Sequence, residues 1–599
     1  MLSRSLLAAA LLMMGTASTF TPAADDSFAA FSKYAADTFG VKHEPLTTQI
    51  PGDRLAFLAD GGWTYVSEDS ATVAVETNLP AAVKVEYGVG GKFDQSAESC
   101  STAGYIHVVS LVGLKPGTTV SYRVTAVDEN GNKVQQPAKT LSPKKVANAV
   151  YVTGATPLPL VCNQSGKTYV LKDDLVAAGT GISVTAPGVT IDLNGHTLTY
   201  NNTAAPSDAA GSEFGQLATQ GTQGVRCSYG TRGSTKLYNG TIKQGAGNGG
   251  YGHVPVLFRG DEIAGVFIDY SGSQVSGIVN ECKQTHHNVI LDRGTELTNR
   301  HQGVQCVGVT GDVHHNLIRR ARQRGIEATS GAKIDRNEIY VDSCATNSFG
   351  IMFYKTKGGE AVGNRIFGTG YLAIGIGTVS EGVSDIRVAK NFIQMQAHAP
   401  DTRWAEYGDQ SGAYCVRLTW GGANITYENN VLVSKGRDGG MVRGVWFCPG
   451  PKISNVVYRN NIIKVISETP DTTAKWGAVV VCGEDSPDTQ PGLFENNTII
   501  SNFCNVRLGE EYGTGKNARF VGNTFVREGD VASYATVICG FDTFNNNGTV
   551  FLNSKFEGGA DLSKNRWEGT GDNGFAAGKI DGGRDVIEQT FKPQAAANQ

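Results

Sequence analysis

The chain has 599 residues, including 76 Gly and 19 Pro, and 52 basic and 56 acidic side chains give a net charge of −4. Glycine is nearly twice its usual share of about 7%, whereas charged residues, at 18%, fall below the usual quarter. The glycines follow no Gly-X-Y period, which excludes collagen. The 40% apolar content excludes overall disorder, and without a basic surface we expect no nucleic-acid partner. The composition favours a turn-rich all-β protein.

The N-terminus is typical of an exported protein. Arg4 precedes an apolar run over residues 6–14, and Ala17 or Ala24 can end a cleaved leader. This run is too short to cross a bilayer, so we predict a signal peptide over residues 1–24 and a lead segment over 25–50. The expected location is extracellular or periplasmic, without a membrane span.

Residues 51–143 are predicted to form a small β-sandwich. Alternating segments at Ala71–Thr77, Val83–Tyr87, Tyr105–Leu111 and Thr119–Asp128 are separated by turn residues. The phrases Val85-Glu-Tyr-Gly and Leu114-Lys-Pro-Gly-Thr-Thr-Val-Ser-Tyr-Arg-Val-Thr-Ala resemble a fibronectin type III domain. The resemblance implies a seven-strand module that acts as a spacer or in adhesion, without chemistry of its own.

A repeat begins near residue 150 and is predicted to continue to residue 570, ahead of a polar tail over 571–599. Its phrase is Asn, any residue, then Ile, Leu or Phe, at intervals of 21 to 39 residues; its copies start at Asn288, Asn316, Asn337, Asn364, Asn391, Asn430, Asn461, Asn497 and Asn523. Such spacing predicts a solenoid of about a dozen coils. We expect the Asn side chains to tolerate left-handed turn angles and to stack as an amide ladder.

A second phrase precedes each Asn, as in Gly303-Val-Gln-Cys, Gly325-Ile-Glu-Ala and Gly444-Val-Trp-Phe. Strand alternation points Val304, Cys306 and Ile326 inward, so the 11 cysteines are expected to be mostly buried free thiols. The region resembles the pectin-lyase-like right-handed parallel β-helix. Because lyases, hydrolases, epimerases, tailspikes and adhesins share that fold, the resemblance implies the scaffold more than the activity.

Outward positions of the same phrase are the candidate substrate-binding surface. Arginine can pair with sugar carboxylates and aromatic rings can cover sugar faces. The candidate substrate-binding residues are Arg226, Arg300, Gln305, Trp446 and Arg507, and the candidate catalytic residues are Lys355, Tyr354, Arg417, Glu327, Glu281 and His301. An ordinary solvated face is the alternative interpretation.

Elimination at a uronic acid needs a cation for the carboxylate and a base for the C5 proton. Tyr354 or Lys355 is the predicted base, with Arg417 as the carboxylate partner. Lys355 stands nine residues before Asn364, which is similar to the alginate lyase and chondroitinase B family and implies Lys355 as the base. The Arg-His-Gly segment of that family is replaced here by Leu372-Ala-Ile-Gly-Ile-Gly.

His301, in Arg300-His301-Gln302-Gly303, is an alternative base or a turn residue. His286-His287-Asn288 and His314-His315-Asn316 fall on neighbouring predicted coils, so these histidines are expected to stack. The stack either packs the turns or binds a metal.

Hydrolysis would instead use two carboxyl groups, Glu281 and Glu327. Two coils apart, their backbones would be about 9.6 Å apart, near the upper end of the inverting range. The acidic pairs Glu484-Asp485 and Glu510-Glu511 make calcium a candidate cofactor, although surface loops explain them as well.

These features predict a secreted, monomeric enzyme that cleaves an acidic, uronate-containing polysaccharide by β-elimination. A glycoside hydrolase is the alternative enzyme, and a non-catalytic glycan-binding or surface protein is the alternative outside catalysis.

Overall fold

The computed structural model places most of the predicted sandwich and solenoid. It describes residues 54–100, 104–203, 221–227, 234–247, 253–258, 260–271, 279–280, 282–293, 305–321, 324–341, 349–368, 372–377, 382–397, 412–419, 421–436, 442–448, 453–468, 477–481, 492–508, 518–527, 537–540, 550–552, 555–557 and 566–568. The predicted leader, lead segment and polar tail lie outside these ranges. Among the described residues, no helix has the length and apolar character needed to cross a membrane.

Seven antiparallel strands form the N-terminal sandwich. They are β1 (Trp63–Val66), β2 (Ser70–Val89), β3 (Gln95–Glu98), β4 (Gly104–Val112), β5 (Val120–Asp128), β6 (Lys133–Gln135) and β7 (Lys139–Leu141). The prediction of separate strands at Ala71–Thr77 and Val83–Tyr87 is wrong, because β2 is continuous through both. Its first half pairs with β1 and β4, its second half pairs with β3 and β5, and the register shifts between Glu76 and Ala81. Both halves of β2 contribute to one apolar core.

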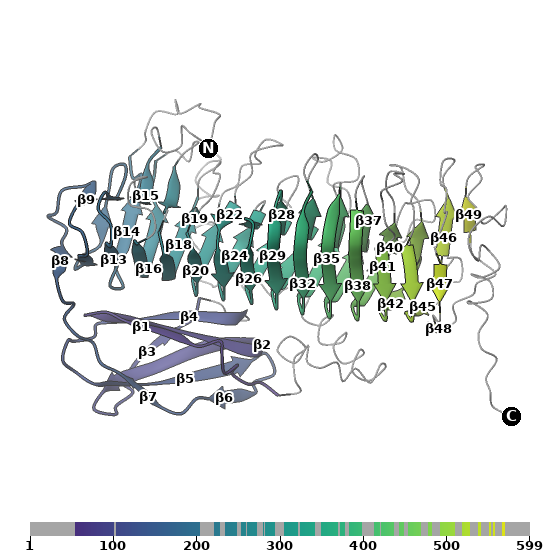
Figure 1. Ribbon diagram of the computed structural model, residues 1–599. Helices are drawn as coiled ribbons and strands as arrows, with labels where there is room; N and C mark the ends of the chain where they lie inside the picture. The colour runs from purple at the N-terminus through teal and green to yellow at the C-terminus, as the bar shows by residue number, and fades with distance from the viewer. Residues whose placement is uncertain are drawn as a thin grey trace, which may run out of the picture.

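The rest of the described chain is a parallel β-helix (Figure 1). One fifteen-stranded parallel sheet runs along its length. Its strands are β9 (Leu160–Cys162), β12 (Ile182–Val184), β15 (Gln223–Cys227), β17 (Val254–Leu257), β19 (Val279–Asn280), β22 (Gln305–Thr310), β25 (Arg324–Ala328), β28 (Phe349–Tyr354), β31 (Leu372–Gly377), β34 (Ala413–Thr419), β37 (Val442–Cys448), β40 (Gly477–Val481), β43 (Val506–Leu508), β46 (Val537–Gly540) and β49 (Arg566–Glu568).

Two further parallel ladders complete each coil, one before the repeated Asn and one after it. The first contains β8 (Ala149–Val152), β10 (Thr168–Leu171), β13 (Thr190–Asp192), β16 (Lys236–Gln244), β18 (Glu262–Tyr270), β20 (Gln284–His286), β23 (Asp312–His314), β26 (Ala332–Asp335), β29 (Lys357–Val362), β32 (Ser384–Ala389), β35 (Gly422–Glu428), β38 (Ile453–Arg459), β41 (Gly492–Glu495), β44 (Ala518–Val521) and β47 (Val550–Leu552).

The second ladder shares β16 and β18, which are long enough to pass through the turn. Its other strands are β11 (Leu175–Val176), β14 (Thr197–Tyr200), β21 (Val289–Asp292), β24 (Leu317–Ala321), β27 (Glu338–Val341), β30 (Arg365–Gly368), β33 (Phe392–Ala397), β36 (Val431–Gly436), β39 (Ile462–Ser467), β42 (Thr498–Ser501), β45 (Thr524–Arg527) and β48 (Lys555–Glu557).

The expected all-β fold, a parallel β-helix preceded by a small sandwich, is confirmed. The expected dozen coils is an underestimate, since the long sheet has fifteen strands, one per coil. The coils ahead of Asn288 carry no copy of the Asn phrase, which explains why the repeat undercounts them. Inward rows such as Ile326, Ile351 and Ile374 are 0% exposed and pair in register, as strand alternation predicts.

The amide ladder is present in all nine repeated asparagines. Each Nδ2 donates to Oδ1 of the next Asn at 2.9–3.0 Å, from Asn288 to Asn523. The same oxygen accepts the backbone N–H of the preceding Asn, as in the Asn364 N to Asn391 Oδ1 bond of 2.9 Å. The side chains are 0–1% exposed, so the ladder satisfies polar groups that have no water to bind.

The left-handed angle lies one residue earlier than expected. The residue before each Asn has positive φ, as at His287, His315, Arg336, Gly363, Lys390, Asn429, Asn460, Asn496 and Gly522. The repeated Asn therefore serves the hydrogen bonds, and the residue before it reverses the chain. We call this position the turn column; Asn194, Asn239 and Gly265 continue it into earlier coils, each with positive φ.

The turn column of the first coils packs against the sandwich (Figure 1). Asn194 Oδ1 accepts the Asp69 N–H at 3.0 Å, and Thr72 Oγ1 donates to Asn239 Oδ1 at 2.7 Å. A side chain at Gly265 would collide with the Trp63 ring, since an added Cβ would lie 2.8 Å from it. The sandwich is thus a packed partner of the helix over these coils.

Eight cysteines in the described residues are free thiols, and six of them are buried. This agrees with the expectation of thiols that pack as small apolar groups.

Candidate functional site

The outward face of the fifteen-stranded sheet carries the predicted row. Register places Glu327, Met352, Gly375, Arg417, Trp446, Val480 and Arg507 side by side on successive strands. Arg226 lies on β15 of the same sheet, where its Nε donates to Ser183 Oγ at 3.2 Å. This register agrees with the predicted row from Glu327 to Arg507, whereas Gln305 pairs with Arg324 and lies outside that row.

Arginines and aromatic rings stack at the centre of the row. The Arg417 guanidinium carbon lies 4.1 Å from the Trp446 ring centre, and that of Arg443 lies 4.2 Å from the same ring. Tyr414 meets Trp446 edge-on at 5.3 Å, and Arg443 lies 4.9 Å from the Tyr414 ring. Stacking of this kind orients each guanidinium plane.

We expected the side chains of Trp446 and Arg507 to be exposed and able to contact a sugar, and they are buried. Trp446 is 3% exposed and Arg507 is 1% exposed. Two guanidinium groups already lie against Trp446, so the ring packs arginine side chains. Arg417, by contrast, is partly exposed and remains the reachable cation of this cluster.

Arg443 and Tyr414 were missed from the sequence. They lie one strand apart, paired in register, two residues ahead of the inward Val445 and Val416. Strict alternation would put residues two positions before an inward valine on the inward side, whereas their contacts with Trp446 place them on the outward side, so the strand pattern could not have found them.

Glu327 forms an ion pair with Arg324 within β25, and the two side chains are 18% and 22% exposed. Tyr354, the last residue of β28, is 40% exposed. Lys355 follows with φ of 54°, and its Nζ lies 5.6 Å from the Tyr354 ring centre. One strand, β31, separates β28 from β34, and Tyr354 lies opposite Thr419 through Gly377, so Tyr354 and Arg417 are about 12 Å apart along the sheet.

Several candidates cannot be placed. Glu281, Arg300, His301 and the acidic pairs Glu484-Asp485 and Glu510-Glu511 lie outside the described residues, as does the side chain of Gln305 on β22. Sheet order puts β22 between β19 and β25.

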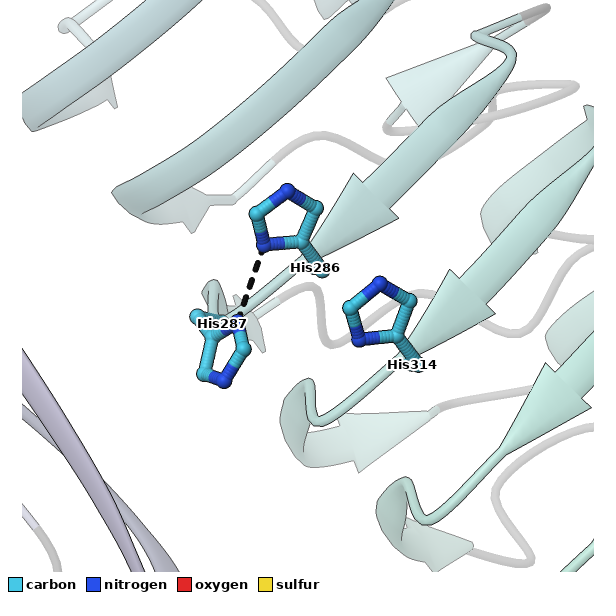
Figure 2. Close-up of side chains that lie close together, drawn as sticks. All are labelled: His286, His287 and His314. Atoms are coloured by element: carbon cyan, nitrogen blue, oxygen red, sulfur yellow. Dashed lines mark hydrogen bonds between the residues drawn. The ribbon is translucent and has the colours of Figure 1, made fainter. Parts of the chain in front are cut away.

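The two His-His phrases stack as predicted. The rings of His286 and His314 lie 4.7 Å apart at 3°, and those of His287 and His315 lie 4.9 Å apart at 6°. Within a phrase, His286 Nδ1 is 2.9 Å from His287 Nδ1 (Figure 2), and His314 Nδ1 is 3.0 Å from His315 Nδ1.

Carboxylates face the outer nitrogens of the stack. Glu262 Oε1 lies 3.1 Å from His286 Nε2, and this hydrogen bond lowers the pKa of Glu262 to about 2. Glu76 Oε2 of the sandwich lies 3.5 Å from His315 Nε2. Burial would raise the pKa of Glu76, but Arg365 and His315 outweigh it and lower that pKa to about 2.

Comparisons with known proteins assign no family to the whole chain. A family model described as a domain of unknown function, DUF7800, matches residues 63–146. The fibronectin-like assignment of that part therefore stays a prediction. No curated protein matches the sequence.

Solved structures similar to this chain are a polygalacturonase and pectate lyases, all at low identity. The Family 28 exopolygalacturonase of Yersinia enterocolitica is 10% identical, over 84% of this chain and 99% of that chain, with a TM-score of 0.27. Pectate lyase Pel3 of Pectobacterium carotovorum is 11% identical over 61% and 86%, with a TM-score of 0.15. Pectate lyase PelI of Erwinia chrysanthemi, in complex with tetragalacturonic acid, is 11% identical over 71% and 90%, with a TM-score of 0.13. Scores this low carry no argument about activity, and the fold rests on the strand pairing itself.

Proposed function

We propose that the protein is a secreted lyase that cleaves an acidic, uronate-containing polysaccharide on the outward face of the fifteen-stranded sheet. The observation that carries the proposal is the partly exposed Arg417, stacked on Trp446, in the same sheet as the exposed Tyr354, which Lys355 follows directly. A polymer lying along the helix axis would cross these strands in turn.

Each group has a role in elimination. The Arg417 guanidinium, oriented by the ring beneath it, pairs with the uronate carboxylate and stabilises the charge that develops when C5 loses its proton. Lys355 or Tyr354 accepts that proton. The C4–oxygen bond then breaks, the oxygen leaves with the departing sugar and takes up a proton, and a C4–C5 double bond remains.

The separation of about 12 Å between the Tyr354 and Arg417 backbones limits where a sugar can be placed between their side chains. The long side chains of Lys355 and Arg417 must both reach toward a saccharide between them.

The test is product analysis on uronate polymers with the full chain. The ultraviolet absorbance of an unsaturated product is expected, and Arg417→Ala and Lys355→Ala should each lower the rate by about 10²-fold or more. Lys333→Ala, which changes an exposed lysine of β26, is the control and should keep the rate.

New reducing ends without that absorbance would indicate a glycoside hydrolase instead of a lyase. Glu327 and Glu281 would then be the residues to substitute next. Binding of the polymer without any product would leave a glycan-binding protein.

A further inference from the structure

We propose that His286, His287 and His314 form a zinc-binding site on the β-helix. The site lies where the helix meets the sandwich, away from the face proposed to bind polysaccharide. One ring nitrogen from each of the three lies within 4.8 Å of the others (Figure 2). Three imidazoles are a common ligand set for Zn²⁺, and an all-nitrogen set suits it better than calcium or magnesium.

The fold brings the ligands together through register. His286 ends β20 and His314 ends β23, and the two residues are partners in the parallel ladder. His287 occupies the turn column with φ of 52°, which directs its ring beside that of His286. The 2.9 Å between the Nδ1 atoms of His286 and His287 is near the separation of about 3.3 Å that two ligands at 2.0–2.1 Å from a tetrahedral ion would have. His314 must move closer by a small ring rotation.

Glu262 prepares His286 for this role. Its carboxylate accepts from His286 Nε2 at 3.1 Å and is itself held by Tyr238 at 2.6 Å and Lys236 at 3.2 Å. With the proton on Nε2, the Nδ1 lone pair of His286 faces His287. A carboxylate that fixes the far nitrogen of a histidine is the usual support of a metal ligand.

The surroundings also favour neutral imidazoles, the form that binds metal. His286 and His287 are 6% and 5% exposed, and Trp63 of the sandwich stacks on His287 at 5.5 Å. Such enclosure disfavours a charged ring and keeps solvent away from the nitrogens that would bind the ion.

The experiment measures metal content and ligand field in the full-length chain. After equilibration with micromolar Zn²⁺ and removal of excess, about one zinc per chain is expected. Co²⁺ in place of Zn²⁺ should give the visible absorption of a cobalt ion with nitrogen ligands in a near-tetrahedral site. His286→Gln and His314→Gln should lose both signals, and Glu262→Gln should weaken affinity by about 10- to 100-fold.

His196→Gln is the matched control, because His196 lies on the same helix in an exposed ion pair with Asp174. It should keep the zinc. Circular dichroism of each variant separates lost ligands from lost folding: a folded His286→Gln or His314→Gln that still binds zinc would overturn the proposal. Wild-type protein that takes up no zinc would also overturn it and would leave the four rings as turn packing.

Discussion

Glu76 is buried where the sandwich meets the helix, and Arg365 donates to its Oε1 at 2.6 Å with both side chains about 1% exposed. A carboxylate in such a place depends on its partner, since desolvation alone disfavours the charge. The Arg365 guanidinium also lies 4.5 Å from the Tyr105 ring, on the strand next to Glu76.

Arg365→Met is therefore expected to lower the free energy of unfolding by about 3–5 kcal/mol, because it leaves the buried Glu76 with only the more distant Arg336, at 4.0 Å, and His315 beside it. Denaturant unfolding measures the change. Arg387→Met is the control: Arg387 pairs with Glu428 at 2.8 Å but is 43% exposed, so its loss should cost about 1 kcal/mol or less. Equal losses in the two variants would contradict the buried pair's role. Adding Glu76→Gln to Arg365→Met should restore part of the stability.

His107 predicts a pH dependence. Its ring is 0% exposed between Thr77 Oγ1 at 3.2 Å and Ser99 Oγ at 3.1 Å, and burial lowers its pKa from 6.5 to about 3. In the unfolded chain His107 therefore binds a proton below about pH 6.5, whereas in the folded chain it binds one only below about pH 3. Stability should fall with decreasing pH across that window by about 1.4 kcal/mol per unit from this residue.

His107→Gln should remove this part of the slope. The measurement is the free energy of unfolding of both proteins from pH 8 to pH 4, and the difference between them isolates His107. A difference that stays constant with pH would show that His107 does not titrate between the two states.

At the scale of the element, the amide ladder holds successive coils in register. Asn391 donates to Ala361 O at 2.9 Å and to Asn430 Oδ1 at 3.0 Å, and its own oxygen accepts two bonds from Asn364. Asn391→Ala would leave several buried groups unpaired, each costing about 1–3 kcal/mol.

We expect Asn391→Ala to lower the free energy of unfolding by about 3 kcal/mol or more, measured by thermal or denaturant unfolding. Asn424→Gly tests an exposed Asn whose amide binds Asp385 at 2.8 Å and whose φ of 55° glycine also accepts. That variant should change stability by less than about 1 kcal/mol. A comparable loss at both positions would mean that burial of the ladder is unimportant.

The sequence predicted this element well because the ladder is a local pattern: one residue type recurs at one place in each coil. The sequence could not predict that the left-handed residue is the one before each Asn. The residue type there differs between coils, as at His287, Arg336 and Gly363. Coil geometry sets positive φ at this position, and although Asn and Gly are frequent there, the His, Arg and Lys members hide the pattern.

At the scale of the whole molecule, the sandwich and the first coils should unfold together. Ion pairs and hydrogen bonds link them, as from Lys172 to Glu68 at 2.6 Å and from Ser67 to Asp192 at 2.5 Å. Trp63 packs against His286 and His287 of the coils opposite.

Hydrogen exchange checks this prediction. Backbone amides of β1 and β2 should exchange with the same opening free energy as those of β18 and β20, because opening one surface exposes the buried polar groups of the other. Arg365→Met should lower both values alike. Faster exchange confined to the sandwich would show that it opens by itself.

The contact between the two parts was also the hardest feature to predict. Glu76, His315, Arg336 and Arg365 are far apart in the sequence, and only the folded register brings them to one place. The outward row was predictable from alternation, whereas the enclosure of Trp446 was not, since burial depends on neighbouring strands and on the side chains stacked against it.

The turn column has a consequence for how such a protein can change in length. The described polar contacts with the sandwich run from Tyr151 on β8 to Arg365 on β30. Inserting a whole coil among them would move every later partner by about 4.8 Å and unpair it. Coils added or deleted after β30 would leave those pairings untouched. Gain and loss of coils during evolution is therefore expected to be concentrated in the C-terminal half of the solenoid.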